Sequence, residues 1–508
     1  MRVWMQSLTC FVLPVMMLCS GSAVASQAAV SETRPQPALA MPLPSIAERE
    51  ELAQQLLELA LADVHPKFNQ LWLQLVSGQH GQDAQWYADL YGVMAQFRRQ
   101  WHGIDWQRRE RLELTGLDLT VNPDDLARYQ RALQAGQLTP LLDESQPQVA
   151  NYQAMRTNLL RLLDMARQGA WPVTAGKTLH PDEADTLVPQ LKYLLARTGD
   201  LPSADQDILY DAATVEAVKA FQRRHGLAVD GVVGNHTWFW LNVKPQERAV
   251  ILARTLLRRD MGPLSYPRYI LVNLPEYRLR LLQDGQPLMT SRVIVGQVKR
   301  QTPILSSQIA SVVVNPAWHV PRSILKKDIV PKLARDPSYL EKEQFDVIDY
   351  EGAQVPPDSI PWEHALAAGF PYQLRQRPGD HNALGRYKFY LPNNDDIYLH
   401  STSSPRLFNK DSRAISSGCV RVEQAAELAH LLLQGSAWTD ERLGNLLEET
   451  TTKWLPLRNP VPVFTVYWRS WLDDQGQLQF RDDIYGFDAG SRMGDSQVMA
   501  SLLAVQKS

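Results

Sequence analysis

Cysteine is scarce in this chain, and its scarcity excludes several classes of protein. The 508 residues contain three cysteines, Cys10, Cys19 and Cys419. A small fold held together by several disulfides is therefore excluded. No C-x-x-C pair and no H-E-x-x-H sequence is present, so the spacings typical of zinc sites are missing. We expect no bound metal and no organic cofactor.

An excess of charge of either sign is also absent. Lys and Arg number 52 against 55 Asp and Glu, which gives no reason to expect a nucleic-acid partner. Hydrophobic residues make up 44% and charged residues 21% of the chain, as in average soluble globular proteins. A chain of 508 residues has room for two or three domains of about 100 to 200 residues each.

Long apolar runs are missing except near the N-terminus. Arg2 is followed by an apolar stretch over residues 3–18 and then by Ala-Val-Ala. This pattern predicts an export signal over residues 1–25 that is cleaved at its end. The stretch is short for a membrane span, which needs roughly 20 apolar residues, and an uncleaved membrane anchor is the alternative. Cleavage would leave Cys419 as the single thiol, and a lone cysteine in an oxidising compartment is either reactive or deeply buried.

Hydrophobic periodicity divides the remaining chain into helical and strand-rich parts. Leu159, Leu160 and Leu163 recur at helical spacing, whereas Tyr277 and Leu279 alternate with arginines as in a strand. The fold class is therefore multidomain α+β, with a helical scaffold, a small three-helix module and a mainly antiparallel β domain. The expected parts are a linker (26–46), the helical scaffold (47–179), the module (180–243), a scaffold return helix (244–263), the β domain (264–440) with a lid insertion (about 322–384), and a C-terminal extension (441–508).

One segment of the β domain concentrates chemistry-bearing residues. His400 ends a predicted strand, and Cys419 follows in a Ser-Ser-Gly-Cys turn before a predicted helix. A thiolate is the attacking species of cysteine enzymes, and a nearby imidazole, the N-terminal field of that helix and Arg421 would all favour it. The backbone amides of Gly418 and Cys419 are the expected oxyanion donors. The pattern indicates nucleophilic catalysis with Cys419 as nucleophile and His400 as base.

Two stretches resemble known families. YDAATVEAVKAFQRRHGLAVDGVVGNHTWFWLN, at residues 210–242, closely resembles the peptidoglycan-binding module of exported wall enzymes. The segment around Cys419 resembles the catalytic signature of the YkuD-type L,D-transpeptidases, in which a histidine precedes a Ser/Thr-His-Gly-Cys turn, an aliphatic residue and often an arginine. The matching residues are His400, Ser416, Ser417, Gly418, Cys419, Val420 and Arg421. Ser417 stands where much of the family has a second histidine, so no role of that histidine carries over.

The resemblance implies a reaction on cell-wall peptide stems in the periplasm of a Gram-negative bacterium. Cys419 would attack the meso-diaminopimelate carbonyl of a tetrapeptide donor, expel D-alanine and form a thioester. An amine of a neighbouring diaminopimelate would then resolve the thioester into a 3→3 cross-link. His400 would take a proton first from the thiol and later from the acceptor amine.

The resemblance also implies roles for residues around this pair. The Ser401 carbonyl would orient the His400 ring, and Arg421 would steady the site or a stem carboxylate, or form a structural salt bridge. The residues expected to line the donor groove are Tyr398, Tyr387, Trp318 and Ser417. For the three aromatic residues, a place in the core is the alternative.

The implied partners are peptidoglycan stem peptides and glycan, with carbapenem β-lactams as covalent inhibitors, and the membrane is contacted only through the export signal. Within the same chemistry, water as acceptor would give an L,D-carboxypeptidase, and a protein lysine would give protein attachment to the wall. A non-catalytic wall-binding protein is the alternative of a different class. A serine acyltransferase is suggested only by Ser323-Ile324-Leu325-Lys326, because the companion S-D-N and K-T-G motifs are absent.

Overall fold

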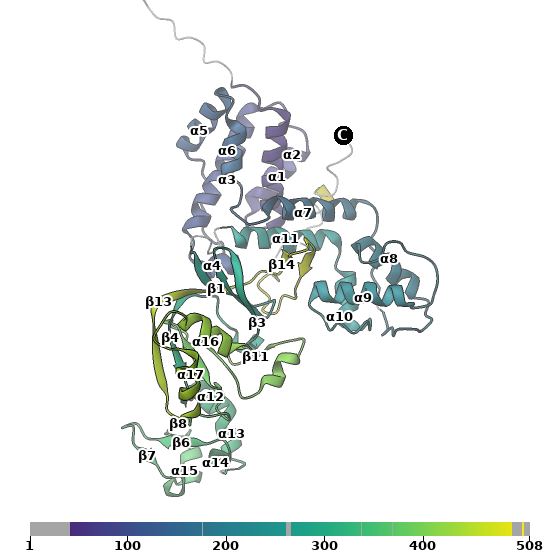
Figure 1. Ribbon diagram of the computed structural model, residues 1–508. Helices are drawn as coiled ribbons and strands as arrows, with labels where there is room; N and C mark the ends of the chain where they lie inside the picture. Colours follow the sequence, from purple (N-terminus) through teal and green to yellow (C-terminus); the bar gives the residue numbers. More distant parts are fainter. Residues whose placement is uncertain are drawn as a thin grey trace, which may run out of the picture. The chain divides into compact units, whose positions relative to one another are not determined.

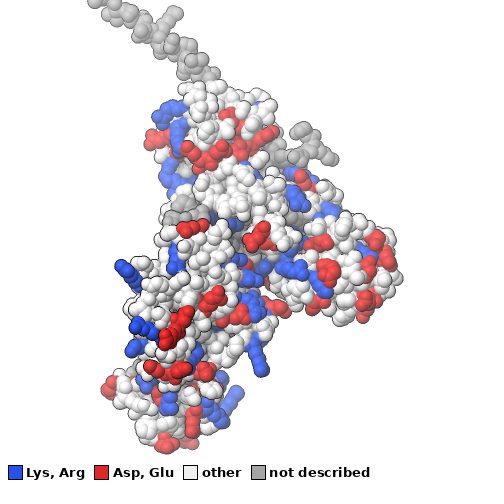
Figure 2. Space-filling model, in the orientation of Figure 1, with Lys and Arg blue, Asp and Glu red and all other residues white. Residues whose placement is uncertain are grey.

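The computed structural model describes residues 41–174, 176–260, 266–336, 338–367, 369–489 and 500–501. The predicted export signal, with Cys10 and Cys19, and most of the predicted linker lie outside the described residues. None of the helices within the described ranges combines the length and the apolar character needed to cross a membrane. Figure 2 shows basic and acidic side chains interspersed on the face in view, in keeping with the balanced composition.

The first part of the described chain is helical (Figure 1). Ser45 starts the first helix with a capping box, since its hydroxyl accepts from the Glu48 amide and the Glu48 carboxylate accepts from the Ser45 amide. The helices of this scaffold are α1 (Ile46–Ala62), α2 (Pro66–Val76), α3 (Ala84–Gly103), α4 (Trp106–Arg111), α5 (Pro123–Gln134), α6 (Leu138–Glu144) and α7 (Tyr152–Arg167). A later helix, α11 (Pro245–Arg259), returns to pack on α1 and α7. Trp72, Trp86 and Trp101 are buried in this core.

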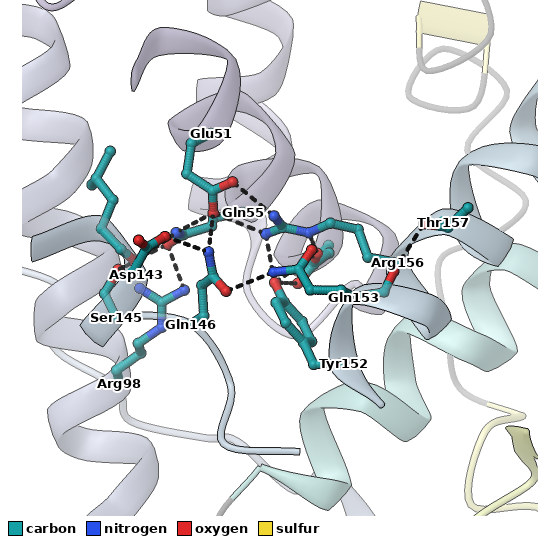
Figure 3. Close-up of polar contacts among 12 residues, drawn as sticks. Glu51, Gln55, Arg98, Asp143, Ser145, Gln146, Tyr152, Gln153, Arg156 and Thr157 are labelled. Atoms are coloured by element: carbon teal, nitrogen blue, oxygen red, sulfur yellow. Dashed lines mark hydrogen bonds and ion pairs between the residues drawn. The ribbon is translucent and has the colours of Figure 1, made fainter. Parts of the chain in front are cut away.

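A polar network inside the scaffold joins three of its helices (Figure 3). Arg156 of α7 forms ion pairs of 2.7 Å with both Glu51 and Glu58 of α1. The Tyr152 hydroxyl donates to Glu58 at 2.9 Å, and Arg98 of α3 donates to Gln55 of α1 at 2.8 Å. Because buried charges are costly unless they are paired and hydrogen-bonded, this network fixes how α1, α3 and α7 pack.

Replacing Arg156 by methionine is expected to lower the free energy of unfolding of the scaffold by about 3 to 5 kcal/mol, because breaking a buried ion pair leaves an uncompensated charge. Glu58 is only 7% exposed, and burial already raises its pKa. Urea unfolding followed by tryptophan fluorescence measures the loss. The control is Arg128→Met, which breaks a pair with Glu144 whose side chains are 56% and 66% exposed and is expected to cost less than about 1 kcal/mol. Equal losses in the two variants would contradict the assignment.

The second part is a module of three helices, as predicted. They are α8 (Val188–Thr198), α9 (Ala212–His225) and α10 (Asn235–Asn242). Asp211 caps α9 by accepting from the Thr214 amide at 2.8 Å, and Gly226 ends it with a φ of 67°. Leu191, Leu195, Val218 and Phe221 are fully buried and form part of the core of the module.

The third part is a nine-stranded sheet in the order β11-β3-β12-β10-β9-β4-β13-β1-β2, and β3 also pairs with β2. Its strands are β1 (Arg268–Asn273), β2 (Arg278–Gln283), β3 (Gln286–Gly296), β4 (Ser306–Val314), β9 (Tyr387–Tyr390), β10 (Leu399–His400), β11 (Ala414–Ser416), β12 (Val420–Val422) and β13 (Lys453–Val466). The pairings are mostly antiparallel, but β1–β13, β10–β12 and β3–β11 run parallel. Helix α16 (Ala425–Leu433) packs on β4, β9 and β13.

Strand β13 lies beyond residue 440, in the segment that the sequence assigned to a C-terminal extension. It pairs with β4 on one side and β1 on the other, so the sheet is not complete without it. Three prolines in this strand, Pro456, Pro460 and Pro462, argue against a central strand in the sequence. The register with β4 shifts between Pro456 and Val461, so Pro460 lies in the irregular stretch, whereas Pro456 and Pro462 lie opposite Ser311 and Gln308 of β4. A short α17 (Asp440–Glu448) precedes the strand, and the hairpin β14 (Ser470–Leu472) and β15 (Leu478–Phe480) follows it.

The insertion between β4 and β9 has a core of its own. It contains a four-stranded sheet in the order β5-β8-β6-β7. The sequence does not reveal this sheet, because strands this short show little alternation. The elements are β5 (Trp318–His319), α12 (Arg322–Ile324), the π-helical turn η2 (Leu325–Ile329), α13 (Val330–Leu333), α14 (Tyr339–Lys342), β6 (Phe345–Ile348), β7 (Gln354–Val355), α15 (Trp362–Ala367) and β8 (Gln373–Gln376). Leu325, Phe345, Val347 and Phe370 are among its buried residues.

Candidate active site

A cavity of about 320 Å³ opens beside Cys419 and His400. One wall comes from β10 and from the turn that precedes β12. The facing wall comes from the insertion. The lining residues on the sheet side are Asp395, Asp396, Ile397, Tyr398, His400, Ser416, Ser417, Cys419 and Arg421, and those on the insertion side include Trp318, Pro321, Ser323 and Ile324. Within the described ranges, no group of three His, Cys, Asp or Glu side chains is arranged to hold a metal ion.

The register of β10 and β12 fixes which side chains share the cavity face. Leu399 pairs with Val420 across the two parallel strands, and both are part of the buried core. Side chains alternate along a strand, so the residues next to this pair project to the opposite face of the sheet. Those residues are Tyr398, His400, Cys419 and Arg421. The predicted nucleophile and base therefore lie on the same face and line the same cavity.

The Cys419 thiol is half-buried and protonated at neutral pH. Its sulfur lies 3.7 Å from the Asp396 carbonyl oxygen. Tyr398 and Trp318 line the cavity beside this thiol. Burial raises the pKa of the thiol, and the hydrogen bonds from Tyr398 and the charges of Lys388 and Arg421 offset this only in part. The resting site therefore holds a thiol, which a base must deprotonate for attack.

The predicted contribution of a helix N-terminus to this thiol is wrong. Cys419 is followed by strand β12, and helix α16 begins only at Ala425. The field of a helix terminus falls off within about one turn, so α16 is not placed to stabilise the thiolate. The sequence did not reveal the intervening strand because it is only three residues long, Val420–Val422.

The His400 imidazole is almost fully buried, with 5% of the residue exposed. Burial, and after it the charge of Arg421, lowers its pKa to about 3. Backbone carbonyls of Ser401 and Leu384 act in the opposite direction, although Nδ1 has no well-aligned hydrogen-bond partner among the described residues. The imidazole is therefore neutral at physiological pH and free to accept a proton.

The turn that carries Cys419 is held by hydrogen bonds on both sides of Gly418. The Gly418 amide donates to the Ser416 hydroxyl at 3.1 Å, and that hydroxyl donates to the Cys419 carbonyl at 2.6 Å. The Thr302 hydroxyl donates to the Gly418 carbonyl at 2.7 Å. Gly418 has a φ of 122°, and a Cβ there would lie 3.2 Å from Ile397, so the position favours glycine.

These bonds correct the predicted pair of oxyanion donors. The Gly418 amide is already engaged by Ser416 and is not free to bind an oxyanion. The Cys419 amide makes no hydrogen bond within the described part of the chain. It remains the backbone donor that the geometry supports.

Of the four residues predicted to line the donor groove, three line the cavity: Tyr398, Trp318 and Ser417. Tyr387 does not, because it is 8% exposed and belongs to the hydrophobic core. Its neighbour Lys388 is the residue of β9 that faces the site, since it pairs with His400 and its Nζ lies 3.9 Å from the Tyr398 ring centroid. The alternation of YKFY could have indicated this, because Tyr387 and Phe389 share the core face.

Ser417 and Ser401 each tie the site to a neighbouring segment. The Ser417 hydroxyl accepts from Arg300 at 2.9 Å, and Arg300 forms an ion pair with Asp328 of the insertion. The Ser401 hydroxyl donates to the Leu384 carbonyl at 3.0 Å and accepts from the Tyr387 amide at 3.0 Å. No motif in the sequence pointed to Arg300 or Asp328, because their contact joins segments that are far apart in the chain.

Arg421 lines the cavity as a cation without an acidic partner. Within the described residues it forms no ion pair, so the predicted structural salt bridge is absent, and its buried Nε has no hydrogen-bond partner. Burial lowers its pKa, and the opposing influence comes from Cys419. An unpaired guanidinium at the wall of a cavity is suited to bind a carboxylate.

Comparisons with known proteins agree with this geometry. Residues 267–443 match the model of the YkuD family, described as the L,D-transpeptidase catalytic domain, and residues 185–241 match a model described as "Putative peptidoglycan binding domain". A Haemophilus influenzae protein named "Putative L,D-transpeptidase" is 43% identical over 219 residues. That match covers 43% of this chain and 44% of the relative, so the chain spans less than half the length of the curated protein it matches.

Two crystal structures are also similar. They are L,D-transpeptidases from Xylanimonas cellulosilytica and Stackebrandtia nassauensis, 15% and 14% identical, with TM-scores of 0.20 and 0.21. The alignments cover 57% and 58% of this chain and 98% of each of those chains. On the family matches, residues 267–443 are similar to the L,D-transpeptidase catalytic domain of the YkuD family, and residues 185–241 are similar to a putative peptidoglycan-binding domain.

Proposed function

We propose that this protein is an exported L,D-transpeptidase that forms 3→3 cross-links in peptidoglycan through a thioester on Cys419. The observation that carries the proposal is the cavity shared by a neutral imidazole and a half-buried thiol. The predicted export signal supports a periplasmic location. The module at residues 185–241 would bring the enzyme to its polymeric substrate.

The first half of the proposed reaction acylates the enzyme. The thiol proton passes to His400 as sulfur bonds to the diaminopimelate carbonyl carbon. The negative charge that develops on the carbonyl oxygen is stabilised by the Cys419 amide. The bond to D-alanine then breaks, and the departing amine takes the proton from the imidazolium.

The second half transfers the acyl group to the acceptor. The acceptor amine enters the cavity, gives a proton to His400 and bonds to the thioester carbon. The carbon–sulfur bond breaks, and the sulfur regains the proton from the imidazolium. Water in place of the amine would give a carboxypeptidase, and a protein lysine would give attachment of that protein to the wall.

Purified disaccharide-tetrapeptides provide the test. Incubation with the protein, followed by mass spectrometry, should show free D-alanine and dimers linked between two diaminopimelates. Cys419→Ala is the negative control. Release of D-alanine without dimers would favour the carboxypeptidase instead. No release of D-alanine from any stem would contradict the enzymatic proposal and favour a wall-binding protein.

Replacing Arg421 by glutamine is expected to raise KM for the donor about 10- to 100-fold, because a charge-assisted hydrogen bond to a carboxylate contributes about 1.5 to 3 kcal/mol. The measurement is D-alanine release over a range of donor concentrations. A donor amidated at its terminal carboxyl is the matched comparison. With the wild type, its KM should be higher than that of the free-carboxyl donor, and the Arg421→Gln substitution should not raise it further. If the variant discriminates between the two donors as strongly as the wild type does, Arg421 does not bind this carboxylate.

A further inference from the structure

The turn that carries Cys419 is supported from outside by Thr302. This residue is fully buried. Its hydroxyl donates to the Gly418 carbonyl at 2.7 Å and accepts from the Gly296 amide at 2.8 Å. The carbonyl of Gly418 and the amide of Cys419 belong to one planar trans peptide, in which C=O and N–H point in opposite directions. By holding the oxygen, Thr302 fixes the direction of the Cys419 N–H, which is the backbone donor left free in this turn.

Thr302 is itself held by Tyr485, a residue of the C-terminal segment. The Tyr485 hydroxyl accepts from the Thr302 amide at 3.1 Å and donates to the Gly296 carbonyl at 2.7 Å. It therefore bridges the two ends of the loop between Gly296 and Thr302. This loop is tight, since a Cβ on Gly296 would lie 2.2 Å from the Arg300 carbonyl oxygen. Tyr485 is 7% exposed, so water does not readily replace these two hydrogen bonds.

Tyr485 is anchored in turn by Tyr467, the residue that follows β13. The Tyr485 amide donates to the Tyr467 hydroxyl at 2.8 Å, and that hydroxyl donates to Asp483 at 2.6 Å. The Tyr467 amide donates to Glu110 of α4 at 2.8 Å. A continuous set of buried bonds thus runs from the helical scaffold, through the C-terminal segment, to the nucleophile turn.

We propose that Thr302 and Tyr485 are positioning residues that aim the Cys419 amide at the oxyanion formed during acylation. This inference rests on the proposed function. Tyr485 lies outside residues 267–443, the segment that matches the transpeptidase family. The C-terminal segment therefore completes the oxyanion site of this chain without contacting substrate.

Two reactions of the same thiol separate this role from a general disturbance of the site. Acylation by a carbapenem passes through an oxyanion, whereas alkylation by iodoacetamide displaces iodide and forms none. In the full-length protein, Thr302→Val is expected to slow acylation about 100-fold, the scale seen when one oxyanion donor is removed. Tyr485→Phe is expected to slow it about 10-fold, because it acts one step further away. Both variants should be alkylated at the wild-type rate, and Thr302→Ser should restore acylation.

Tyr210→Phe is the matched control. Tyr210 is a buried tyrosine whose hydroxyl donates to the Gly231 carbonyl at 2.6 Å inside the three-helix module, so its loss should leave both rates unchanged. Wild-type acylation rates in Thr302→Val and Tyr485→Phe would overturn the positioning role alone. Acylation and alkylation falling together would also overturn it, because the thiol itself would then be disturbed. A wild type that no carbapenem acylates would overturn the proposed function along with it.

Discussion

Replacing Cys419 by alanine is expected to reduce D-alanine release by a factor on the order of 10⁵ or more, as removal of the nucleophile does in other acyl-transfer enzymes. The thiol is the nucleophilic side chain that shares the cavity with a neutral imidazole, and the thioester cannot form without it. Ser323, which also lines the cavity, begins a Ser-x-x-Lys sequence that lacks its companion motifs, and it should not take over.

Intact-mass measurement with a carbapenem checks this prediction directly. The wild type should gain the mass of one inhibitor molecule, and Cys419→Ala should gain none. Ser323→Ala is the matched control, since it removes a different hydroxyl-bearing side chain from the same cavity and should still form the adduct. An adduct that persists in Cys419→Ala would remove this cysteine from the mechanism.

Replacing His400 by alanine is expected to slow acylation about 10³-fold at neutral pH, within the range that a general base contributes. The pH profile should change as well. In the wild type the reactive pair is a thiol with a raised pKa and an imidazole with a pKa of about 3, so both partners keep their protonation state across neutral pH. We expect the wild-type rate to be nearly constant from about pH 5 to pH 8.

In His400→Ala, only the small fraction of Cys419 that is present as thiolate can react. That fraction grows about tenfold per pH unit below the thiol pKa. The acylation rate of His400→Ala should therefore rise about tenfold per pH unit from about pH 5 to pH 8, where the wild-type rate is nearly constant. His319→Ala is the control, because His319 is an exposed histidine of the insertion that does not line the cavity. Parallel profiles for wild type and His400→Ala would show that His400 is not the base.

Local patterns in the sequence were sufficient for much of this architecture. Helical spacing predicted the scaffold and the three-helix module, and strict alternation predicted strands such as β2. The helix that follows the Cys419 turn was also predicted, and in α16 Ala425, Leu428, Ala429 and Leu432 are buried. These features depend on residues within a few positions of one another, which is the range over which periodicity is informative.

Such local patterns could not predict the contacts between distant segments. Residues 441–508 were assigned to a C-terminal extension, yet their strand β13 lies inside the sheet between β4 and β1. Tyr387 was assigned to the groove, yet it lies in the hydrophobic core and its neighbour Lys388 faces the site. The Gly418 amide was expected to be free, and only the folded turn shows that Ser416 occupies it.

The sequence by itself determined the chemistry that is available: one thiol beyond the predicted export signal, a histidine at a strand end and a glycine where a left-handed backbone is needed. The tertiary structure decided how that chemistry is presented. Burial sums the effect of every surrounding segment, and it sets the pKa of Cys419 and of His400. Strand pairing over long distances places Thr302, Gly418 and Tyr485 in one set of hydrogen bonds. Local spacing in the sequence cannot predict a contact between residues that are so far apart in the chain.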